Sequence, residues 1–208
     1  MNKFLINLDR DTEKMSFHRD VIRITATDGL KLSLDEIKNS KLYMRYNTKE
    51  NKIRGHLGCI LSHRRVLQHI IDNKINDVCI LEDDSTSDFE LPDELKDTDH
   101  ITYLGGWLVN KKMKDIKKPV KQELKDGINE LTDSRVLTTR AYYIPQWKHA
   151  QGLLDHINNK KVWRGIDIMV SEYVRHLYYP ALSHQILGFE SSIGNMKPKH
   201  NYKFYIPE

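Results

Sequence analysis

The sequence predicts an α/β fold, because short apolar strands alternate along it with helices that carry one apolar face. Two brief apolar runs, "KFLIN" (3–7) and "DVCILEDD" (77–84), read as strands. Between them, "RGHLGCILSHRRVLQHIIDN" (54–73) has apolar residues at helical spacing. We expect a Rossmann-like mixed sheet flanked by helices. No second core is evident, so residues 1–208 are expected to form a single domain.

In the first half of the chain, "KFLIN" predicts a buried strand that opens into the polar loop "LDRDTEKM". "VIRITATDG" (21–29) predicts a second strand, closed by a turn at Asp28-Gly29. "DVCILEDD" is continuously apolar up to its acids, as expected of a strand covered on both faces. One face of the 54–73 helix is expected to carry Ile60, His63, Leu67, Ile70 and Ile71.

In the second half, "HITYLGG" (100–106) predicts a strand that ends in a tight glycine turn, and "VLTTRAYYI" (136–144) predicts another. Residues 107–135 are lysine-rich and weakly periodic, so we expect a flap or hairpin outside the core. Pro145 suits the first turn of a helix over 145–157. A helix over 165–177 and a last strand over 181–188 complete the expected elements. The apolar stripe of the 165–177 helix comprises Ile166, Val170, Tyr173, Val174 and Leu177.

Composition narrows the class of protein. The net charge is only +4, and no arginine-rich arm alternates with aromatic residues, so we expect no nucleic-acid partner. The two cysteines, Cys59 and Cys79, are too few for a disulfide framework or a zinc cluster and fit a reducing compartment. No segment approaches the ~20 apolar residues of a membrane-spanning helix. The apolar run in "MNKFLINLDR" is far shorter than the hydrophobic segment of a signal peptide. We therefore expect a cytoplasmic location.

Three consecutive acids, Glu82, Asp83 and Asp84, follow the best strand candidate. In open α/β sheets, ligands bind at the carboxyl ends of strands. Adjacent carboxylates repel one another, and burial raises their pKa values unless a cation or hydrogen-bond donors compensate. Mg²⁺ or Mn²⁺ would do so, since both prefer oxygen ligands and bridge carboxylates to a diphosphate. The alternative is an acidic turn that faces water.

A phosphatase with a nucleophilic aspartate is a further alternative for a strand that ends in acids. Such a site needs Asp-x-Asp, whereas this chain has Glu82-x-Asp84. The longer glutamate side chain would misplace the attacking oxygen, so we reject this alternative.

Four fragments in order, "FLINLDRDTEKM", "ATDG", "GHLGCILSHRRV" and "ILEDD", resemble family 25 glycosyltransferases, which include bacterial lipooligosaccharide and collagen galactosyltransferases. The resemblance continues more thinly through "YLGG", "RAYYI" and "IDIMV" to "HQILGFESSIG". It implies a GT-A-like fold, a sugar–nucleotide donor, a divalent metal (usually Mn²⁺) and inversion at the anomeric carbon. One departure is His56, where the family usually has Glu.

The resemblance also implies roles for individual residues. Asp84 would be the direct metal ligand, with Glu82 or Asp83 reaching the nucleotide ribose or a metal-bound water. Gly58 and His63 match the family's helix start; the alternative to direct contact is close packing and a satisfied side chain, and for His63 we expect that alternative. A carboxyl-terminal histidine, His184 or His200, would complete the metal shell. The nucleotide-sugar would also contact Asn7, Asp9 and Arg10 after the first strand, Asp28 and Gly29 at the turn, and Gly105 through a close backbone approach.

The resulting hypothesis is a metal-dependent enzyme that moves a hexose, galactose or glucose, from a UDP-sugar to a hydroxyl of a glycan or glycoprotein. An inverting transfer needs one carboxylate as base. Asp167, which matches the family's "VD" segment, is our candidate, and Glu172 is the second choice. Asp167 near a helix start would also serve as a cap. Two alternatives remain: a nucleotidyltransferase, and a nucleotide-sugar-binding protein without turnover.

Overall fold

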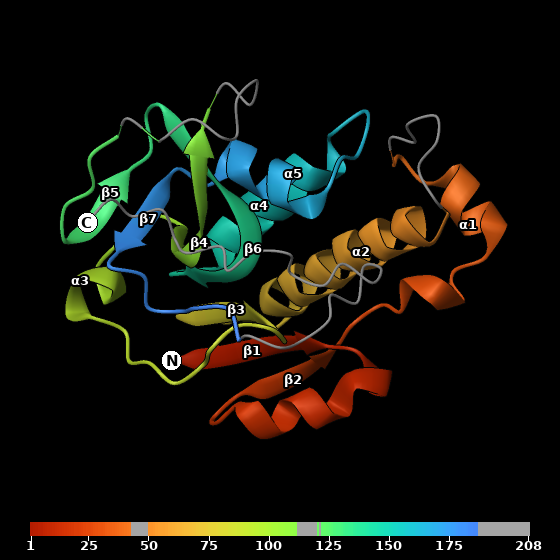
Figure 1. The fold of residues 1–208 in the computed structure, drawn as a ribbon, viewed down its shortest axis with the longest axis horizontal. Helices are drawn as coiled ribbons and strands as arrows, with labels where there is room; N and C mark the ends of the chain where they lie inside the picture. Colours follow the sequence, from red (N-terminus) through yellow and green to blue (C-terminus); the bar gives the residue numbers. More distant parts are fainter. Residues whose placement is uncertain (43–49, 112–119, 121, 187–208) are drawn as a thin grey trace.

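The part of the chain that the computed structural model describes, residues 1–42, 50–111, 120 and 122–186, contains one mixed sheet of seven strands (Figure 1). Their order across the sheet is β2-β1-β3-β6-β4-β7-β5. The strands are β1 (Asn2–Asn7), β2 (Ile22–Thr25), β3 (Val78–Glu82), β4 (Thr102–Asn110), β5 (Gly127–Glu130), β6 (Ser134–Ile144) and β7 (His176–Tyr179). The predicted α/β class is confirmed.

The strands β2, β1 and β3 run parallel, so their carboxyl ends meet at one edge of the sheet. Asn7 pairs with Thr25 across β1 and β2, and Ile6 pairs with Glu82 across β1 and β3. The strand β6 is antiparallel to β3, with Leu81 opposite Ala141. Residues just before Ala141 therefore continue past the end of β3. This brings Thr139 to the same edge as the acids.

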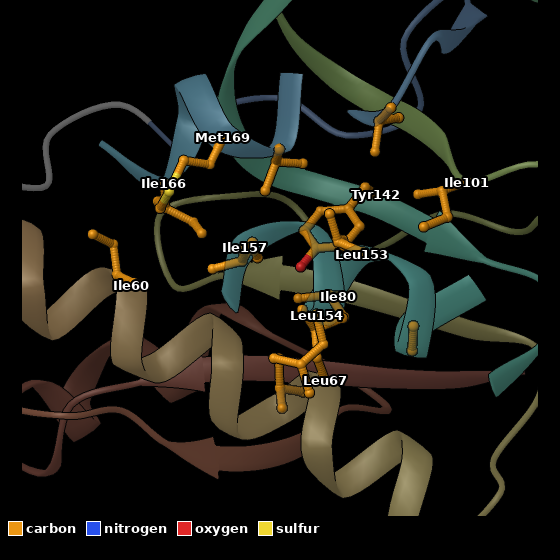
Figure 2. Close-up of a cluster of buried hydrophobic side chains, with 14 of the residues drawn as sticks. Ile60, Leu67, Ile80, Ile101, Tyr142, Leu153, Leu154, Ile157, Ile166 and Met169 are labelled. Atoms are coloured by element: carbon orange, nitrogen blue, oxygen red, sulfur yellow. The ribbon is translucent and has the colours of Figure 1, made fainter. Parts of the chain in front are cut away.

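Helices cover one face of the sheet, and Figure 2 shows the apolar side chains between the two layers. From the sheet, Ile80 and Tyr142 contribute to this core, and Ile60, Leu153 and Ile166 contribute from three different helices. Alternate residues along a strand face opposite sides, so the helix-facing residues of β3 are Val78 and Ile80. The covering helices are α2 (Glu50–Asp72), α4 (Trp147–Asn158) and α5 (Ile166–Tyr173).

Shorter segments cover the other face. Leu5, Cys79 and Leu81 point to this side and pack with Leu91 and Leu95. Apolar residues in β1 and β3 are thus buried on both faces, as their continuous apolar runs predict. The remaining helices are the 3-10 helices η1 (Asp9–Phe17) and η2 (Gly29–Lys31), and the short α1 (Leu34–Asn39) and α3 (Asp93–Lys96).

The expected turn at the end of "HITYLGG" is wrong, because β4 continues through both glycines. A Cβ atom on Gly105 would lie 2.1 Å from the carbonyl oxygen of Ser183. Gly106 has a φ of 140°, which side chains disfavour, and lies where the β4–β6 register shifts. The glycines therefore serve close packing and a bulge.

The segment 107–135 is not an excursion as a whole. Its ends belong to the sheet, since β4 and β6 stay paired from Trp107–Leu137 to Asn110–Ser134. Its middle contains β5, which pairs with β7. Residues 112–119 and 121 lie outside the described residues. Part of its low apolar content reflects β5, which lies at the edge of the sheet.

The predicted helix over 165–177 is too long. The helix α5 ends at Tyr173, and β7 follows and pairs with β4 and β5. Leu177 is buried in the sheet, so its place in the helical stripe is coincidental. The expected strand over 181–188 is reduced, among described residues, to a single bridge between Gln185 and Ser85. Pro145 precedes α4, whose N-cap is Gln146.

Candidate active site

A pocket lies at the edge where β1, β2 and β3 end. Its empty volume is about 780 Å³, which includes the open space at its mouth. The α2 helix closes one side. The lining residues are Ile6, Leu8, Arg10 and Lys14 after β1; Ala26, Thr27, Asp28, Gly29 and Leu30 after β2; Gly55, Cys59, Ser62 and His63 from α2; and Glu82, Asp83 and Asp84.

Glu82 is held by the core. His63, which is 1% exposed, lies with Nε2 3.2 Å from Glu82 Oε1 and with Nδ1 3.0 Å from the Tyr142 hydroxyl. The Thr139 hydroxyl donates to the same glutamate oxygen. Burial alone would raise the pKa of Glu82, but the hydrogen bonds from His63 and Thr139 lower it overall. Glu82 is therefore a fixed, ionised group.

Asp83 is held by the neighbouring strand and by η1. Its carboxylate accepts hydrogen bonds from Asn7 Nδ2 at 3.0 Å and from Lys14 Nζ at 3.2 Å. Burial raises the pKa of Asp83, and Lys14 and Asn7 oppose this rise. Asn7 also accepts a hydrogen bond from Arg23 Nε. Asp83 thus joins β3, β1 and η1.

Asp84 has the fewest donors of the three acids. Its Oδ2 accepts a hydrogen bond from Gln185 Nε2 at 3.1 Å. Its Oδ1 is buried, and no described residue forms a hydrogen bond with it. Burial, followed by the negative charge of Glu82, raises the pKa of Asp84 to about 6. A buried carboxylate oxygen without a donor is costly, and a bound cation would remove that cost.

Asp167 lies beside Glu82 on the other side of Thr139. Its Oδ1 accepts the Thr139 backbone N–H at 3.1 Å and is 3.0 Å from the Thr139 hydroxyl. One hydroxyl proton cannot serve both carboxylates. Burial, with the charge of Glu82 added, raises the pKa of Asp167. The backbone just before this contact is strained, since Thr138 has a φ of 138°.

The turn after β2 supports one wall of the pocket. Arg10 Nη1 lies 2.5 Å from Asp28 Oδ1, which also accepts the Leu30 N–H. Burial would raise the pKa of Asp28, but the contacts with Arg10 and Leu30 lower it overall. Gly29 allows the turn to pack against α2, because a Cβ atom at this position would lie 2.1 Å from the Arg54 carbonyl oxygen.

Gly58 does the same from the helix side, where a Cβ atom would lie 2.7 Å from the Thr27 carbonyl oxygen. Gly58 thus packs closely against the turn, whereas the buried His63 lines the pocket and contacts both Glu82 and Tyr142.

Other sequence-predicted site residues lie apart from the pocket lining. The carboxylate of Asp9 is 64% exposed and pairs with Arg23 at 2.5 Å. Gly105 packs under Ser183, and Glu172 pairs with Lys160 at 2.6 Å. His200 lies outside the described residues.

Sequence reasoning did not assign roles to Thr139, Gln185 or Lys14. Each contacts an acid that is more than 50 positions away along the chain. Lys14 belongs to the fragment "FLINLDRDTEKM", which carries part of the family resemblance, so the sequence did offer a signal for it. No local pattern distinguishes Thr139 or Gln185, because their contacts arise only from strand pairing and segment packing.

The geometry does not by itself complete a metal centre. In the described ranges, no three His, Cys, Asp or Glu side chains are grouped so as to hold a metal ion.

The same part of the chain contains no helix that is both long and apolar enough to cross a bilayer.

A family model described as glycosyltransferase family 25 (LPS biosynthesis protein) matches residues 1–170. The chain belongs to glycosyltransferase family 25. It is therefore a glycosyltransferase, which acts on a sugar donor and an acceptor, and this favours glycosyl transfer over the nucleotidyl transfer that the sequence left open. The match spans β1, the three acids and Asp167. A search of curated proteins found no match.

The unpartnered carboxylate oxygen predicts the effect of Asp84→Asn on stability. The folded-state pKa of about 6 lies above the ordinary 3.8, so ionisation of Asp84 destabilises the fold as pH rises from about 4 to about 6. With EDTA present, Asp84→Asn is expected to raise the free energy of unfolding by about 1–3 kcal/mol at pH 7.5 and to change it little at pH 4.

Urea unfolding at the two pH values measures this effect. The matched control is Asp155→Asn, because exposed Asp155 also accepts a glutamine amide hydrogen bond, from Gln151 at 2.9 Å. It should change the free energy of unfolding by less than about 0.5 kcal/mol at either pH. An Asp84→Asn variant that is less stable than wild type at pH 7.5 would contradict the prediction.

Proposed function

We propose that this glycosyltransferase moves a hexose, galactose or glucose, from a UDP-sugar to a hydroxyl of a glycan or glycoprotein, with a divalent cation and with inversion. The observation that carries the proposal is the buried Oδ1 of Asp84, which has no hydrogen-bond donor among the described residues and belongs to a pocket-lining acid cluster. A cation together with a diphosphate would satisfy it.

The donor set fits Mn²⁺ or Mg²⁺. These ions prefer oxygen ligands, and Mg²⁺ is commonly bound by one or two carboxylates together with substrate phosphates. Asp84 would hold the ion, with Glu82 beside it. When bound, the ion would neutralise charge on the departing diphosphate. This arrangement needs no third protein ligand, in keeping with the described residues, and His200 remains a candidate outside them.

The cationic side of the pocket suits a nucleoside diphosphate. Arg10 lines the pocket and is oriented by Asp28, and Lys14 lines it beside Asp83. A guanidinium group matches phosphate geometry, and both cations would attract the charged part of the donor. Asp28 then acts by holding Arg10 in place.

An apolar wall adjoins these cations. Ile6, Leu8, Ala26 and Leu30 line the pocket at the ends of β1 and β2, whereas the acids stand at the end of β3. The flat face of a uracil ring can pack against this wall, whereas a hexose presents hydroxyls around its whole rim, and these need hydrogen-bond partners. We place the base over β1 and β2 and the hexose towards β6.

The reaction would be a single displacement. The acceptor oxygen forms a bond to the anomeric carbon, the bond from that carbon to the diphosphate oxygen breaks, and the acceptor proton passes to a carboxylate. Asp167 is our proposed base, since it lies on the β6 side of Glu82 and burial raises its pKa, which makes it a stronger proton acceptor. Glu82, which is already hydrogen-bonded twice, would stay ionised.

A donor-hydrolysis screen tests the proposed function. Nucleotide sugars are incubated with the enzyme, with Mn²⁺ or with EDTA, and the released nucleotide is measured. We expect release from a UDP-hexose only with the metal, and none above background from Asp84→Asn, while Asp155→Asn behaves as wild type. Metal-independent release, or a preference for a donor other than a UDP-sugar, would refute the proposal.

Asp167→Asn tests the base. The N-cap position of α5 is Gly165, and Asp167 instead accepts the Thr139 N–H of β6; asparagine keeps an oxygen for that N–H, so a purely structural role predicts near wild-type transfer. As the base, Asp167 predicts a loss of at least ~100-fold in transfer rate with UDP affinity unchanged. Initial rates and calorimetric UDP titration separate the two. A near wild-type rate would make Asp167 a structural partner of Thr139 and place the base elsewhere.

Leu30→Ser tests the base-binding wall. Leu30 is 54% exposed and lines the pocket, whereas Leu34 is 51% exposed and does not, so Leu34→Ser is the matched control. We expect Leu30→Ser to weaken UDP binding by about fivefold to tenfold through lost apolar contact. Binding of inorganic diphosphate with Mn²⁺ should be unchanged. Equal effects of the two variants on UDP affinity would contradict the placement.

A further inference from the structure

Residues 182–186 lie across the end of β3, next to the acids. The backbone N–H groups of Leu182 and Ser183 donate to the Leu104 carbonyl oxygen at 2.8 and 3.0 Å. The Ile186 N–H donates to the Asp84 carbonyl oxygen at 2.7 Å. The 182–186 segment is thus hydrogen-bonded to β4 at one end and to Asp84 at the other.

A second set of contacts fixes the middle of the segment. Thr86 donates its N–H to the His184 carbonyl oxygen at 2.8 Å and accepts the His184 N–H on its hydroxyl at 2.9 Å. The Ser183 hydroxyl donates to the Thr86 carbonyl oxygen at 2.8 Å. Beneath Ser183, Gly105 has no side chain and leaves the room that the segment occupies. These bonds fix the backbone from which the Gln185 side chain extends.

The side chain so positioned is Gln185. Its Nε2 donates to Asp84 Oδ2 at 3.1 Å. Glu82 and Asp83 each have two side-chain contacts with other elements, whereas Gln185 makes the one side-chain hydrogen bond to Asp84 among described residues. With Oδ2 engaged, Oδ1 is the oxygen left without a donor.

We propose that Gln185 is a positioning residue that orients Asp84 and keeps its Oδ1 available for a divalent cation. The proposal rests on the proposed function, in which Asp84 holds the cation. Carboxylates that bind metals are themselves commonly oriented by a hydrogen-bonded neighbour, and loss of that neighbour typically weakens metal binding by about 10–100-fold. Gln185 would act through Asp84 without touching the ion.

The test is Mn²⁺ binding to Gln185→Met, which keeps the length of the side chain and removes the amide donor. Mn²⁺ is titrated with and without UDP, and the electron paramagnetic resonance signal of the free ion is followed. We expect binding at least about tenfold weaker than in wild type. Gln151→Met is the matched control, because Gln151 donates to Asp155 in the same way on α4, and it should bind Mn²⁺ as wild type does.

Two further variants distinguish positioning from a merely structural role. Gln185→Asn keeps the amide but is one methylene shorter, so it should also weaken Mn²⁺ binding, and it serves if Gln185→Met does not fold. Combining Gln185→Met with Asp84→Asn should weaken Mn²⁺ binding no further than Asp84→Asn alone, because both changes remove one interaction.

The outcomes separate the two proposals. If wild type binds Mn²⁺ and both folded Gln185 variants bind it equally well, the positioning role is refuted while the proposed function stands. Gln185 variants with a lower melting temperature and an unchanged Mn²⁺ affinity would also refute the positioning role. Gln185 would then only stabilise the packing of the 182–186 segment. If wild type itself binds no Mn²⁺ with or without UDP, both proposals fail.

Discussion

The placement of three neighbouring carboxylates at the end of a buried strand is the constraint to which the rest of the site responds. Glu82, Asp83 and Asp84 would each lose hydration on folding and would repel one another. The surrounding elements compensate them separately. Glu82 receives donors from α2 and β6, Asp83 receives an amide and an ammonium group from β1 and η1, and Asp84 receives one amide from the 182–186 segment.

This unequal compensation divides the work among the acids. The two acids with fuller sets of donors are fixed, and they tie elements far apart in the sequence to the end of β3. The third keeps a buried oxygen without a described donor, which a folded protein ordinarily avoids. Burying an unpaired carboxylate oxygen has no structural benefit of its own. The loss of local stability at Asp84 is therefore expected to serve function.

The sequence predicted correctly those elements whose pattern lies within a short stretch of the chain. The β1 and β3 strands, the α2 helix and the acids at the strand end were predictable because apolar periodicity and strand termination are local properties. The end of α5 was not, because His176–Tyr179 joins the sheet through partners in β4 and β5. Gly105 was read as a turn because a sequence does not display Ser183 above it.

The same reasoning explains which site residues were missed. Arg10, Asp28 and the acids stand at strand ends, so topology alone brings them together. Thr139 reaches Glu82 because β6 runs antiparallel past the end of β3, and the direction of that pairing cannot be read from "VLTTRAYYI". Gln185 depends on backbone bonds to β4 and Asp84 that no local pattern encodes.

The change of strand direction at β3 also gives the site two unlike sides. On the parallel side, Arg10 and Lys14 bring positive charge to the pocket. On the antiparallel side, Thr139 joins Glu82 to Asp167, a second carboxyl group whose pKa burial raises. The proposed inverting transfer would use such an asymmetry, because charge would accumulate on the departing group while the acceptor hydroxyl loses a proton on the opposite side. The strand β3 lies where the parallel part of the sheet meets the antiparallel part, and it carries the acids that lie between these two sides of the site.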